Sequence, residues 1–355
     1  MAILVLPGDG IGPEITEATL TVLKAADRKF GLGLEFEFDD IGFVALDKTG
    51  TTFPDAVLEK ARQSDGILLG PIDHLAYPAR DKGGVNVSAK VRVELDLYAN
   101  VRPARTREGI VKKAGDFDLV IMRECTEGFY PDRNMVAGTG EFMPTDDIAL
   151  SVRKITAPAC NRIARRSFEL ARRRRKKVTA VHKANNFILS DGLFLREVRK
   201  VAEDYPDVEL QERIVDAMAA LLVRDPSQFD VICATNFHAD ILSDLASELA
   251  GGLGLAGSTN ENEALCCAQA QHGSAPDIAG QDRANPTSLI LSAAMLFEWL
   301  AAKRGEQKFA EGAATINAAI DAVLAEPSSR TADLGGPLGT QAFAAVVAER
   351  IMGTG

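Results

Sequence analysis

Two aspartates, Asp240 and Asp244, stand four residues apart, shortly after an apolar run at residues 230–234 that is typical of a buried strand. Side chains at this spacing lie on one face of a helix. With a third carboxylate, Asp216, they would supply the oxygen donors that Mg²⁺ or Mn²⁺ prefers and leave positions for substrate oxygens. The alternative is that Asp240 and Asp244 only interact with the dipole of their helix.

Three arginines, Arg92, Arg102 and Arg123, form the second candidate set. Arg123 follows the apolar run at residues 118–122. An arginine at the end of a buried strand points toward the crevice in which α/β sheets bind ligands, so we expect the three at the ends of elements. A planar guanidinium pairs with a carboxylate through two hydrogen bonds. Each arginine alone is compatible with a surface ion pair, but the trio indicates a di- or tricarboxylate ligand.

Lys183 directly follows another apolar run, at residues 178–181, within the sequence VHKAN. Poor solvation at the end of a buried strand would lower the pKa of this lysine and make it a candidate general base. The alternative is an ordinary lysine at a strand terminus. We expect the neighbouring His182 to be structural.

A loop at residues 272–280, HGSAPDIAG, could hold an adenosine or a pyrophosphate through its backbone amides. Asp277 could accept hydrogen bonds from both ribose hydroxyls and would repel a 2′-phosphate, which favours NAD over NADP. A second glycine-rich segment, residues 8–13, lies between a strand and a helix. It fits neither the GxGxxG nor the GxxxxGK[ST] pattern, so a tight turn is favoured there.

The elements that must position these residues alternate between strands and helices. Apolar runs without alternation predict strands buried on both faces, at residues 2–6, 66–69, 118–122, 178–181 and 230–234. Helical spacing predicts helices from residue 13 onward and at residues 155–175, 191–204, 240–249, 287–303 and 311–324. The pattern predicts an α/β fold with helices on both faces of its sheet. Residues 131–147 are rich in Gly, Pro and Asp and predict an extended arm.

Length and composition limit the possible classes of protein. The chain has 355 residues, 46% of them hydrophobic, which predicts a globular protein of about two domains. A net charge of −10 disfavours nucleic acid and anionic membranes as partners. No apolar stretch reaches the ~18 residues of a membrane span, and no basic leader precedes the first strand, so we expect a cytoplasmic protein. The five cysteines form no CxxC and are expected to be reduced.

A basic run at residues 172–177 has two interpretations. Cations are favourable at the C-terminus of a helix, and we prefer this structural explanation. The run has no interleaved aromatic residues, which speaks against a nucleic-acid surface.

Taken together, these segments resemble the β-decarboxylating dehydrogenases, which act on isocitrate, isopropylmalate, homoisocitrate and tartrate. The resemblance covers nearly the whole chain. It is carried by LPGDGIGPE, RVELDLYANVRP, MRECTEGFY, VHKAN, ILSDLASELAGGLG, HGSAPDIAGQDRANP and TADLGG.

The resemblance implies a two-domain, isopropylmalate dehydrogenase-like α/β fold without a GxGxxG Rossmann domain. Residues 1–99 and 251–355 would form a large cofactor-binding domain. Residues 100–250 would form the substrate and dimerisation domain, with the arm near residues 131–147 clasping a partner. It also implies a homodimer, or a higher oligomer, whose subunits share their active sites.

The same resemblance assigns roles to individual residues. Tyr130 would protonate the substrate carbon, and Lys183 of the partner subunit would be the base. The remaining assignments fall into three groups. Substrate carboxylates would bind Arg92, Arg102 and Arg123, with Asn86 and Ser88 in the selecting stretch. Mg²⁺ or Mn²⁺ would bind Asp240 and Asp244 with the partner's Asp216, and K⁺ is a further candidate cation. NAD would contact Asn185, His272, Gly273, Ala275, Asp277, Ile278 and Asn285.

The chain departs from the family pattern at several positions. Gln269-Ala270 stands where Glu-Pro is usual, and Ala239 replaces a glycine before the first metal aspartate. Ser88 and Ala89 occupy the positions of two leucines that line the isopropyl pocket of isopropylmalate enzymes. A polar pocket should disfavour an isopropyl group by roughly 1–3 kcal/mol. We therefore expect a polar γ-substituent, as in isocitrate or homoisocitrate, or a small polar substrate such as tartrate or malate.

Two alternatives remain open. One is a 3-isopropylmalate dehydrogenase of leucine biosynthesis. The other, from a different class, is a non-catalytic regulatory or nucleic-acid-binding protein that uses the basic run. The acidic balance of the chain and the presence of both Tyr130 and Lys183 speak against the second.

Overall fold

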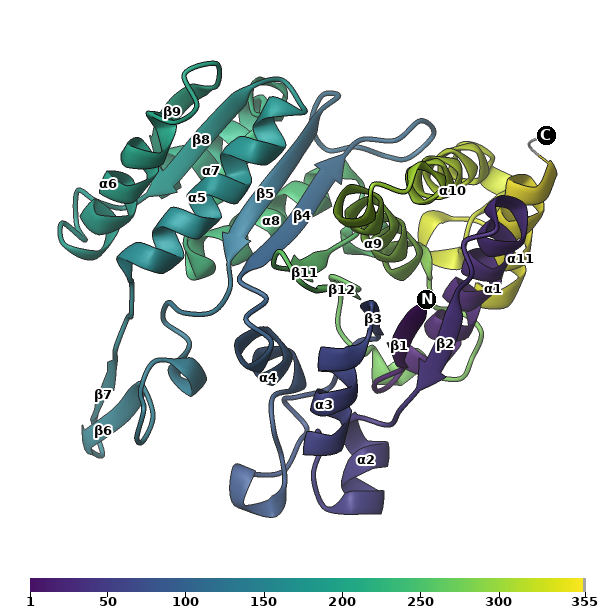
Figure 1. The fold of residues 1–355 in the computed structure, drawn as a ribbon, viewed down its shortest axis with the longest axis horizontal. Helices are drawn as coiled ribbons and strands as arrows, with labels where there is room; N and C mark the ends of the chain where they lie inside the picture. The colour runs from purple at the N-terminus through teal and green to yellow at the C-terminus, as the bar shows by residue number, and fades with distance from the viewer. Residues whose placement is uncertain (354–355) are drawn as a thin grey trace. The chain divides into compact units, whose positions relative to one another are not determined.

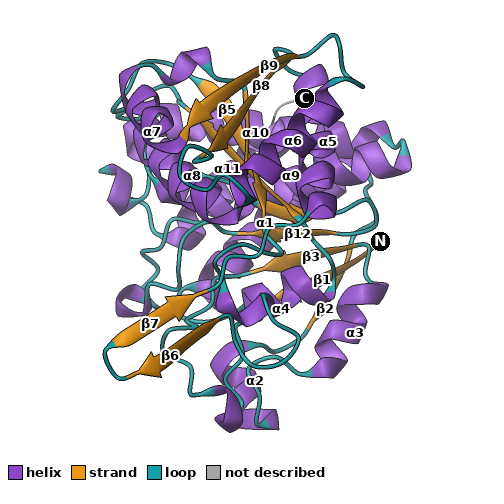
Figure 2. Ribbon diagram, turned by 90° about the vertical axis from the view of Figure 1, so that its left-hand side faces the viewer, coloured by secondary structure: helices purple, strands orange, loops and turns teal. Residues whose placement is uncertain are grey.

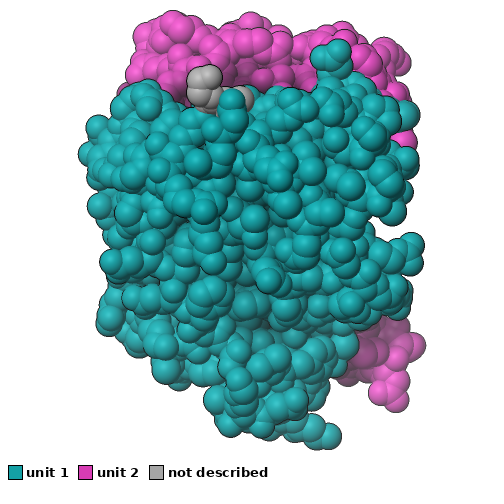
Figure 3. Space-filling view, turned by 90° about the vertical axis from the view of Figure 1, so that its right-hand side faces the viewer, with its two compact units in different colours: residues 1–95, 107–111, 251–355 teal, residues 96–106, 112–250 magenta. Residues whose placement is uncertain are grey.

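The computed structural model describes residues 1–353 and divides into two compact units, which Figure 3 colours separately. Unit 1 comprises residues 1–95, 107–111 and 251–355, and unit 2 comprises residues 96–106 and 112–250. The chain therefore passes between the units four times, and its first and last described segments belong to unit 1. Within each unit, strands pair side by side and helices pack on them (Figures 1 and 2).

The strands of unit 1 are mostly parallel. Strand β1 (Ala2–Leu6) pairs in parallel with β2 (Glu35–Phe38) and β3 (Gly66–Leu69). Strand β12 (Cys266–Gln269) runs parallel to β3 and antiparallel to β11 (Thr259–Glu261). Apart from Ala2, every residue of β1, β3, β11 and β12 is buried, as expected for strands covered on both faces.

Four long helices build the main core of unit 1. They are α1 (Gly12–Phe30), α9 (Thr287–Arg304), α10 (Gln307–Ala325) and α11 (Thr340–Gly353). Three shorter helices, α2 (Gly42–Thr49), α3 (Asp55–Gln63) and α4 (Val87–Glu94), lie between β2 and the end of the unit's first segment. Helix α4 carries both Ser88 and Arg92.

The glycine-rich turn between β1 and α1 is held by its own chain. The Asp9 carboxylate accepts the backbone N–H groups of Phe43 and Asp73, at 2.9 and 3.0 Å, and the Tyr77 hydroxyl. Gly10 has φ +58°, and a Cβ there would collide with the carbonyl oxygen of Ser274. The turn therefore packs directly against the loop at residues 272–280, which it helps to position.

Five strands of unit 2 pair side by side in the order β4 (Ala99–Arg105), β5 (Asp118–Glu124), β10 (Val231–Ala234), β8 (Lys177–His182) and β9 (Glu209–Ile214). Only β4 is antiparallel to its neighbour within this order. Helices α5 (Ala157–Arg172) and α6 (Ser190–Ala202) form one core with the sheet. Helices α7 (Val215–Arg224) and α8 (Asn236–Ala250) form a second one.

The arm predicted near residues 131–147 includes the first strand of an antiparallel hairpin, β6 (Glu141–Thr145), and the second strand, β7 (Ile148–Ser151), lies just beyond the predicted range. Every residue of both strands is exposed, including Phe142, Met143, Ile148 and Leu150. An isolated two-stranded hairpin is marginally stable in water, so an arm of this kind is suited to packing on another surface.

The structure corrects one expectation about the arginines and changes another about α8. The prediction that all three arginines stand at the ends of elements was wrong for Arg102, which lies in the middle of β4. Arg92 lies in the last turn of α4, and Arg123 is the last but one residue of β5. Helix α8 begins at Asn236, four residues before the predicted start. Asp240 therefore lies in the second helical turn, and no acidic residue lies in the first. The helix dipole acts mainly in the first turn, so this position weakens the dipole explanation.

The basic run belongs to the framework of unit 2. Arg174 and Arg175 contact the buried carboxylate of Asp230, and Arg172 and Lys176 contact Asp207. These contacts agree with the structural explanation preferred from the sequence. All five cysteines are buried and free, as predicted. No helix within residues 1–353 is long and apolar enough to cross a membrane.

Candidate active site

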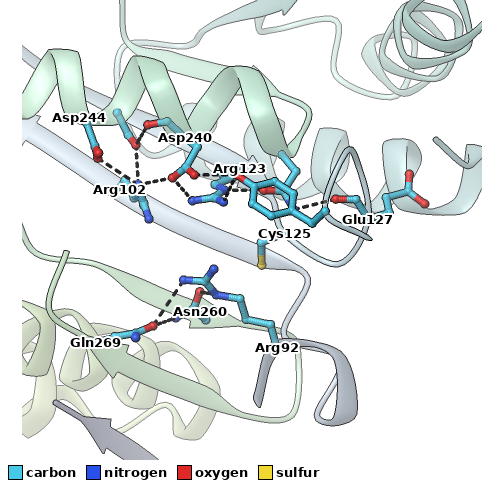
Figure 4. A network of polar contacts seen from close by, with 12 residues as sticks. Arg92, Arg102, Arg123, Cys125, Glu127, Asp240, Asp244, Asn260 and Gln269 are labelled. Atoms are coloured by element: carbon cyan, nitrogen blue, oxygen red, sulfur yellow. Dashed lines mark hydrogen bonds and ion pairs between the residues drawn. The ribbon is translucent and has the colours of Figure 1, made fainter. Parts of the chain in front are cut away.

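Asp240 is the centre of a charged network in unit 2 (Figure 4). Tyr130 donates its hydroxyl to Asp240 Oδ2 at 2.6 Å. Asp240 Oδ1 accepts hydrogen bonds from Arg102 Nη1, at 3.1 Å, and from Arg123 Nη1. Arg102 Nη1 also reaches Asp244 Oδ1 at 3.3 Å. The structure thus brings together five of the residues that the sequence singled out: Tyr130, Arg102, Arg123, Asp240 and Asp244.

Sheet register and helix periodicity explain this convergence. Strands β4 and β5 are antiparallel neighbours, with Arg102 opposite Ile121 and Asn100 opposite Arg123. Helix α8 follows β10, the other neighbour of β5, and its second and third turns present Asp240 and Asp244 to the two arginines. The two guanidinium groups are almost completely buried, so their charges require fixed partners.

Two further residues of α8 were missed by the sequence reasoning. Asn236 Oδ1 accepts a hydrogen bond from Arg123 Nε at 2.8 Å, and Ser243 Oγ accepts one from Arg102 Nη1 at 2.7 Å. Asn236, Asp240 and Ser243 follow a spacing of four and three residues, so they share one helical face. That spacing was available in the sequence, but the predicted helix began too late to include Asn236.

Tyr130 is held so that its phenol stays protonated. Burial raises the pKa of Tyr130 to about 12, and the Asp240 charge raises it as well, while Arg123 opposes the shift. Arg133 stacks over the ring, with its guanidinium carbon 4.9 Å from the ring centre. Arg123 Nη2 donates to the phenol oxygen at 3.1 Å. A protonated phenol with a cation beside its oxygen is suited to donate a proton.

Lys183 and Asp216 form a separate pair in unit 2. Lys183 Nζ lies 2.6 Å from Asp216 Oδ1, and this contact lowers the pKa of the Asp216 carboxyl. The lysine follows β8 and the aspartate lies in the first turn of α7. Asp191, which is fully buried, accepts the Lys183 backbone N–H at 2.5 Å and contacts Arg153 Nη1 at 2.7 Å. Asp191 was not singled out from the sequence.

The donor set agrees in chemistry with a divalent cation but is incomplete in one chain. Asp240 and Asp244 offer hard carboxylate oxygens one helical turn apart, and both side chains are accessible to solvent. Within the described residues 1–353, no group of three or more His, Cys, Asp or Glu side chains is placed to hold an ion. A bound ion would therefore need donors beyond these two carboxylates.

Arg92, in unit 1, is held differently. Arg92 Nε donates to Asn260 Oδ1 at 2.8 Å, and Arg92 Nη2 lies 3.4 Å from Gln269 Oε1. Gln269 Nε2 reaches Ser88 Oγ at 2.7 Å. The lower part of Figure 4 shows Arg92, Asn260 and Gln269 pointing toward one another. Sequence reasoning noted Gln269 only as a departure from the family pattern and missed Asn260.

The other residue of the selecting stretch, Asn86, caps a helix. Its side-chain oxygen accepts the backbone N–H of Ala89 at 3.1 Å, which makes Asn86 the N-cap of α4. This contact occupies the oxygen in fixing the start of the helix that carries Ser88 and Arg92.

The loop at residues 272–280 presents accessible groups in unit 1. Asp277 is exposed, and Ala275 adopts a left-handed φ of 39° at the start of the turn that contains Asp277 and Ile278. A Cβ on Gly273 would meet open space. Asn285 donates to Asp333 Oδ2 at 3.0 Å. In unit 2, Asn185 is exposed in the turn after β8.

His272 offers a polar atom for a ligand in the same loop. Its Nδ1 lies 3.0 Å from the carbonyl oxygen of Gly273. Its Nε2 is buried and finds no hydrogen-bond partner within residues 1–353. Burial lowers the pKa of His272, so the ring is neutral at physiological pH. A neutral ring with an unpaired nitrogen beside open backbone fits a nucleoside that carries its own donors and acceptors.

Comparison with known proteins decides the family. The isocitrate/isopropylmalate dehydrogenase family model matches residues 2–349. The chain belongs to this family. It is 41% identical over 347 residues to the 3-isopropylmalate dehydrogenase of Archaeoglobus fulgidus, with 98% of each chain covered. It is also 41% identical over 351 residues to the isocitrate/homoisocitrate dehydrogenase of Thermus thermophilus, again with 98% of each covered.

A solved structure extends the comparison to the fold of this family member. The crystal structure of isocitrate dehydrogenase from Methylococcus capsulatus matches with a TM-score of 0.88 at 39% sequence identity, and 99% of each chain is covered. The predicted family, the α/β fold class and the dehydrogenase class are thereby confirmed. Members of this family are dehydrogenases that decarboxylate hydroxy acids, so the alternative of a non-catalytic protein loses its support.

Proposed function

We propose that this family member catalyses the NAD-dependent oxidative decarboxylation of a 2-hydroxy acid that carries a 3-carboxylate. The observation that carries the proposal is the network of Tyr130, Asp240, Arg102 and Arg123. It combines a protonated phenol, two buried cations and an accessible carboxylate within hydrogen-bond distance of one another. These are the groups needed to bind carboxylates and to deliver a proton to carbon.

Each residue has a role that follows from its chemistry. Arg102 and Arg123, with Arg92 in unit 1, bind the substrate carboxylates. Lys183 takes the proton of the substrate hydroxyl group while a hydride leaves the carbon that bears this hydroxyl. The resulting β-keto acid loses CO₂, and Tyr130 donates its proton to the carbon that carried the lost carboxylate. Asp240 accepts the Tyr130 hydroxyl in the free protein and so orients it.

Two groups supplied from outside the chain complete the chemistry. NAD⁺, when bound, would supply the hydride acceptor, and Mg²⁺ or Mn²⁺, when bound, would supply Lewis-acid stabilisation of developing negative charge. Asp240 and Asp244 would hold the ion with the partner's Asp216, and K⁺ is a further candidate cation. His272, Gly273, Ala275, Ile278 and Asn285 contact the adenosine, Asp277 accepts from its ribose, and Asn185 approaches the nicotinamide. The exposed carboxylate of Asp277 supports NAD over NADP because it would repel a 2′-phosphate.

The functional form is a homodimer, or a pair of such dimers, with shared active sites. The Lys183–Asp216 contact supports this arrangement, because the two residues assigned to the partner form one pair while Tyr130 and Asp240 form another. The exposed hairpin of β6 and β7 is the arm that clasps the partner, and residues 100–250 carry the dimer contacts. The large domain, residues 1–99 and 251–355, binds the cofactor.

Isocitrate and homoisocitrate are the favoured substrates, followed by tartrate and malate. Ser88 contributes a hydroxyl to the selecting stretch where an isopropyl pocket would need leucine. The second candidate is 3-isopropylmalate, which is supported by the 41% identity to an enzyme of that name. We expect the cytoplasm as the location and expect neither nucleic acid nor a membrane as a partner.

A substrate panel tests the proposal. NADH formation is measured with isocitrate, homoisocitrate, isopropylmalate, D-malate and tartrate, with Mn²⁺ and K⁺ present and with NAD⁺ and NADP⁺ compared. We expect the highest kcat/KM with isocitrate or homoisocitrate and NAD⁺. The highest value with isopropylmalate would favour the second candidate, and no turnover of any of these acids would reject the proposal.

A further inference from the structure

Asp191 is a buried charge in unit 2 to which the proposed mechanism gives no role. Its side chain is 0% exposed, and it lies in the first turn of α6, directly after the turn that carries Lys183. Asp191 Oδ2 accepts the Lys183 backbone N–H at 2.5 Å, and Asp191 Oδ1 lies 2.7 Å from Arg153 Nη1. A buried carboxylate needs fixed partners, so this one holds the Lys183 main chain and the Arg153 side chain together.

The turn after β8 also fixes the other side of the Lys183 main chain. The carbonyl oxygen of Lys183 accepts the backbone N–H groups of Asn186 and Phe187, both at 2.9 Å. The backbone N–H of Asp191 in turn donates to the carbonyl oxygen of Phe187 at 3.0 Å. Residues 183–191 thus form a closed turn. The direction in which the Lys183 side chain leaves the main chain therefore depends on the Asp191 carboxylate.

Arg153 connects this turn to the segment that carries Tyr130. Its guanidinium carbon lies 5.3 Å from the ring centre of Phe129 and 5.2 Å from that of Phe187. Phe129 directly precedes Tyr130, and Phe187 belongs to the turn that carries Lys183. Attraction between the cation and both rings places Arg153 between the segments of the proposed acid and the proposed base.

A second set of contacts fixes Arg153 itself, whose side chain is 6% exposed. The following residue, Lys154, exchanges two backbone hydrogen bonds with Gly128, both at 3.0 Å. Arg153 Nη1 donates to Ser190 Oγ at 3.2 Å, and Nη2 donates to Thr235 Oγ1 at 3.0 Å. Two hydroxyls, two rings and a carboxylate thus surround one planar group, an arrangement that the point charge of a lysine would not reproduce.

We infer that Asp191 and Arg153 are positioning residues for Lys183, and that their buried ion pair ties the turn of the proposed base to the segment of the proposed acid. This inference rests on the proposed function, which assigns Lys183 to the partner's site and Tyr130 to the chain's own site. Loss of the pair misplaces Lys183. It therefore slows the step in which Lys183 takes the hydroxyl proton while the hydride leaves.

Asp191→Asn is the first test, because it keeps the size of the side chain and removes one acceptor. A carboxylate accepts the Lys183 N–H with one oxygen and faces Arg153 with the other, whereas an amide turns its NH₂ group toward one of these two donors. We expect kcat for NADH formation to fall by about 10- to 100-fold with smaller changes in KM, because misplacing a reacting group by about 1 Å can cost about 10²-fold.

Asp230→Asn is the matched control, because Asp230 is the same kind of group in the same unit. Asp230 is fully buried, accepts the backbone N–H of Arg175 at 2.8 Å and accepts Arg174 Nε at 2.8 Å, but neither arginine has a role in the proposed mechanism. Both variants should melt at a lower temperature, and only Asp191→Asn should lower kcat. Arg153→Lys, with Arg174→Lys as its control, keeps the inference testable if Asp191→Asn does not fold.

Subunit mixing gives a readout that a purely structural defect would not produce. Asp191→Asn affects the Lys183 that its own chain supplies. Mixing it with Tyr130→Phe should restore about a quarter of wild-type activity after subunit exchange, because each heterodimer then has one intact site. Mixing it with Lys183→Met should give no gain, since neither chain then supplies a well-placed base. A structural defect would respond alike to both partners.

The outcomes separate this inference from the proposed function. Unchanged kcat in folded Asp191→Asn, equal losses of kcat in Asp191→Asn and Asp230→Asn, or recovery with Lys183→Met would overturn the inference alone. Absence of recovery between Tyr130→Phe and Lys183→Met would overturn the shared sites. In that case the comparison of the two asparagine variants still decides the role of Asp191. Absence of wild-type turnover on every hydroxy acid would overturn both the proposed function and the inference.

Discussion

The two units hold their arginines in contrasting ways. In unit 2, Arg102 and Arg123 contact the carboxylate of Asp240, and Tyr130 donates to its second oxygen. In unit 1, Arg92 contacts the neutral amides of Asn260 and Gln269. Carboxylates can exchange protons and bind cations, whereas side-chain amides only orient the groups to which they are hydrogen-bonded. In the function proposed above, the chemical steps therefore fall to the residues of unit 2, and Arg92 of unit 1 only binds the substrate.

The largest effect should come from removing the proton donor of unit 2. We expect Tyr130→Phe to lower kcat by about 10²- to 10⁴-fold, the usual contribution of a positioned acid, with little change in thermal stability. Steady-state NADH formation measures it. Tyr205→Phe, at another buried tyrosine of unit 2, is the matched control and should keep nearly full activity. Comparable losses of kcat in both variants would contradict the proposal that Tyr130 in the Asp240 network is the proton donor.

Mixing two inactive variants tests whether the two pairs of unit 2 act across subunits. Tyr130→Phe and Lys183→Met protomers, each inactive alone, should regain about a quarter of wild-type activity after subunit exchange, because each heterodimer has one intact site. Activity is measured after exchange has been verified with differently tagged chains. No recovery would show that Lys183 and Tyr130 serve the same chain's site.

A smaller effect is expected from Glu127, which supports the Tyr130 loop. Burial raises the pKa of Glu127 to about 7, from an ordinary value of 4.5, and its carboxylate accepts the backbone N–H of Thr156. Because its pKa is raised, the protonated Glu127 carboxyl is favoured in the folded state. Its contribution to the free energy of unfolding is therefore fully present below pH 4.5 and is lost as pH rises through about 7. Glu127→Gln should reduce the change in the free energy of unfolding over this pH range by about 1–3 kcal/mol.

Denaturant unfolding at several pH values measures that change, with Glu203→Gln at an exposed position as the control. The wild-type protein should lose stability relative to Glu127→Gln between pH 4.5 and 7. Parallel curves for the two proteins would mean that Glu127 is solvated in the folded state.

The smallest effect concerns recognition by unit 1. Asp277→Lys should weaken NAD⁺ and improve NADP⁺, changing the ratio of their kcat/KM values by about tenfold, because the new cation no longer accepts from the ribose and attracts a 2′-phosphate. Initial rates with both cofactors measure the ratio. Glu311→Lys makes the same charge change at an exposed site on α10 and should leave it unaltered. Unchanged kinetics in Asp277→Lys would show that Asp277 does not contact the ribose.

Local patterns predicted the buried strands well, because apolar runs bounded by turns leave little choice. Strands β1 and β3 have the predicted bounds, and β5, β8 and β10 differ from prediction by no more than two residues at either end. Helix α4 was not predicted because it is short and four of its eight residues are polar or charged. Its start depends on the Asn86 cap, a contact that apolar spacing does not reveal.

The contents of the site were more predictable than its connections. Asp240 and Asp244 could be paired because one helix carries both. Arg102 and Asp240 are 138 residues apart, and Ser88 and Gln269 are 181 apart, so only the folded sheet brings each pair together. The sequence marked Gln269 as unusual for the family. Its hydrogen bonds, which accept from Asn260 and donate to Ser88, could be assigned only from the folded structure.

The hairpin of β6 and β7 has a thermodynamic consequence. Its strands expose Phe142, Met143, Ile148 and Leu150, and two strands alone bury too little surface to offset the entropy of ordering them. Whatever covers these side chains therefore contributes to folding itself. If a second copy of the chain covers them, mass action makes the melting temperature rise with protein concentration. Dilution then lowers the stability of the fold.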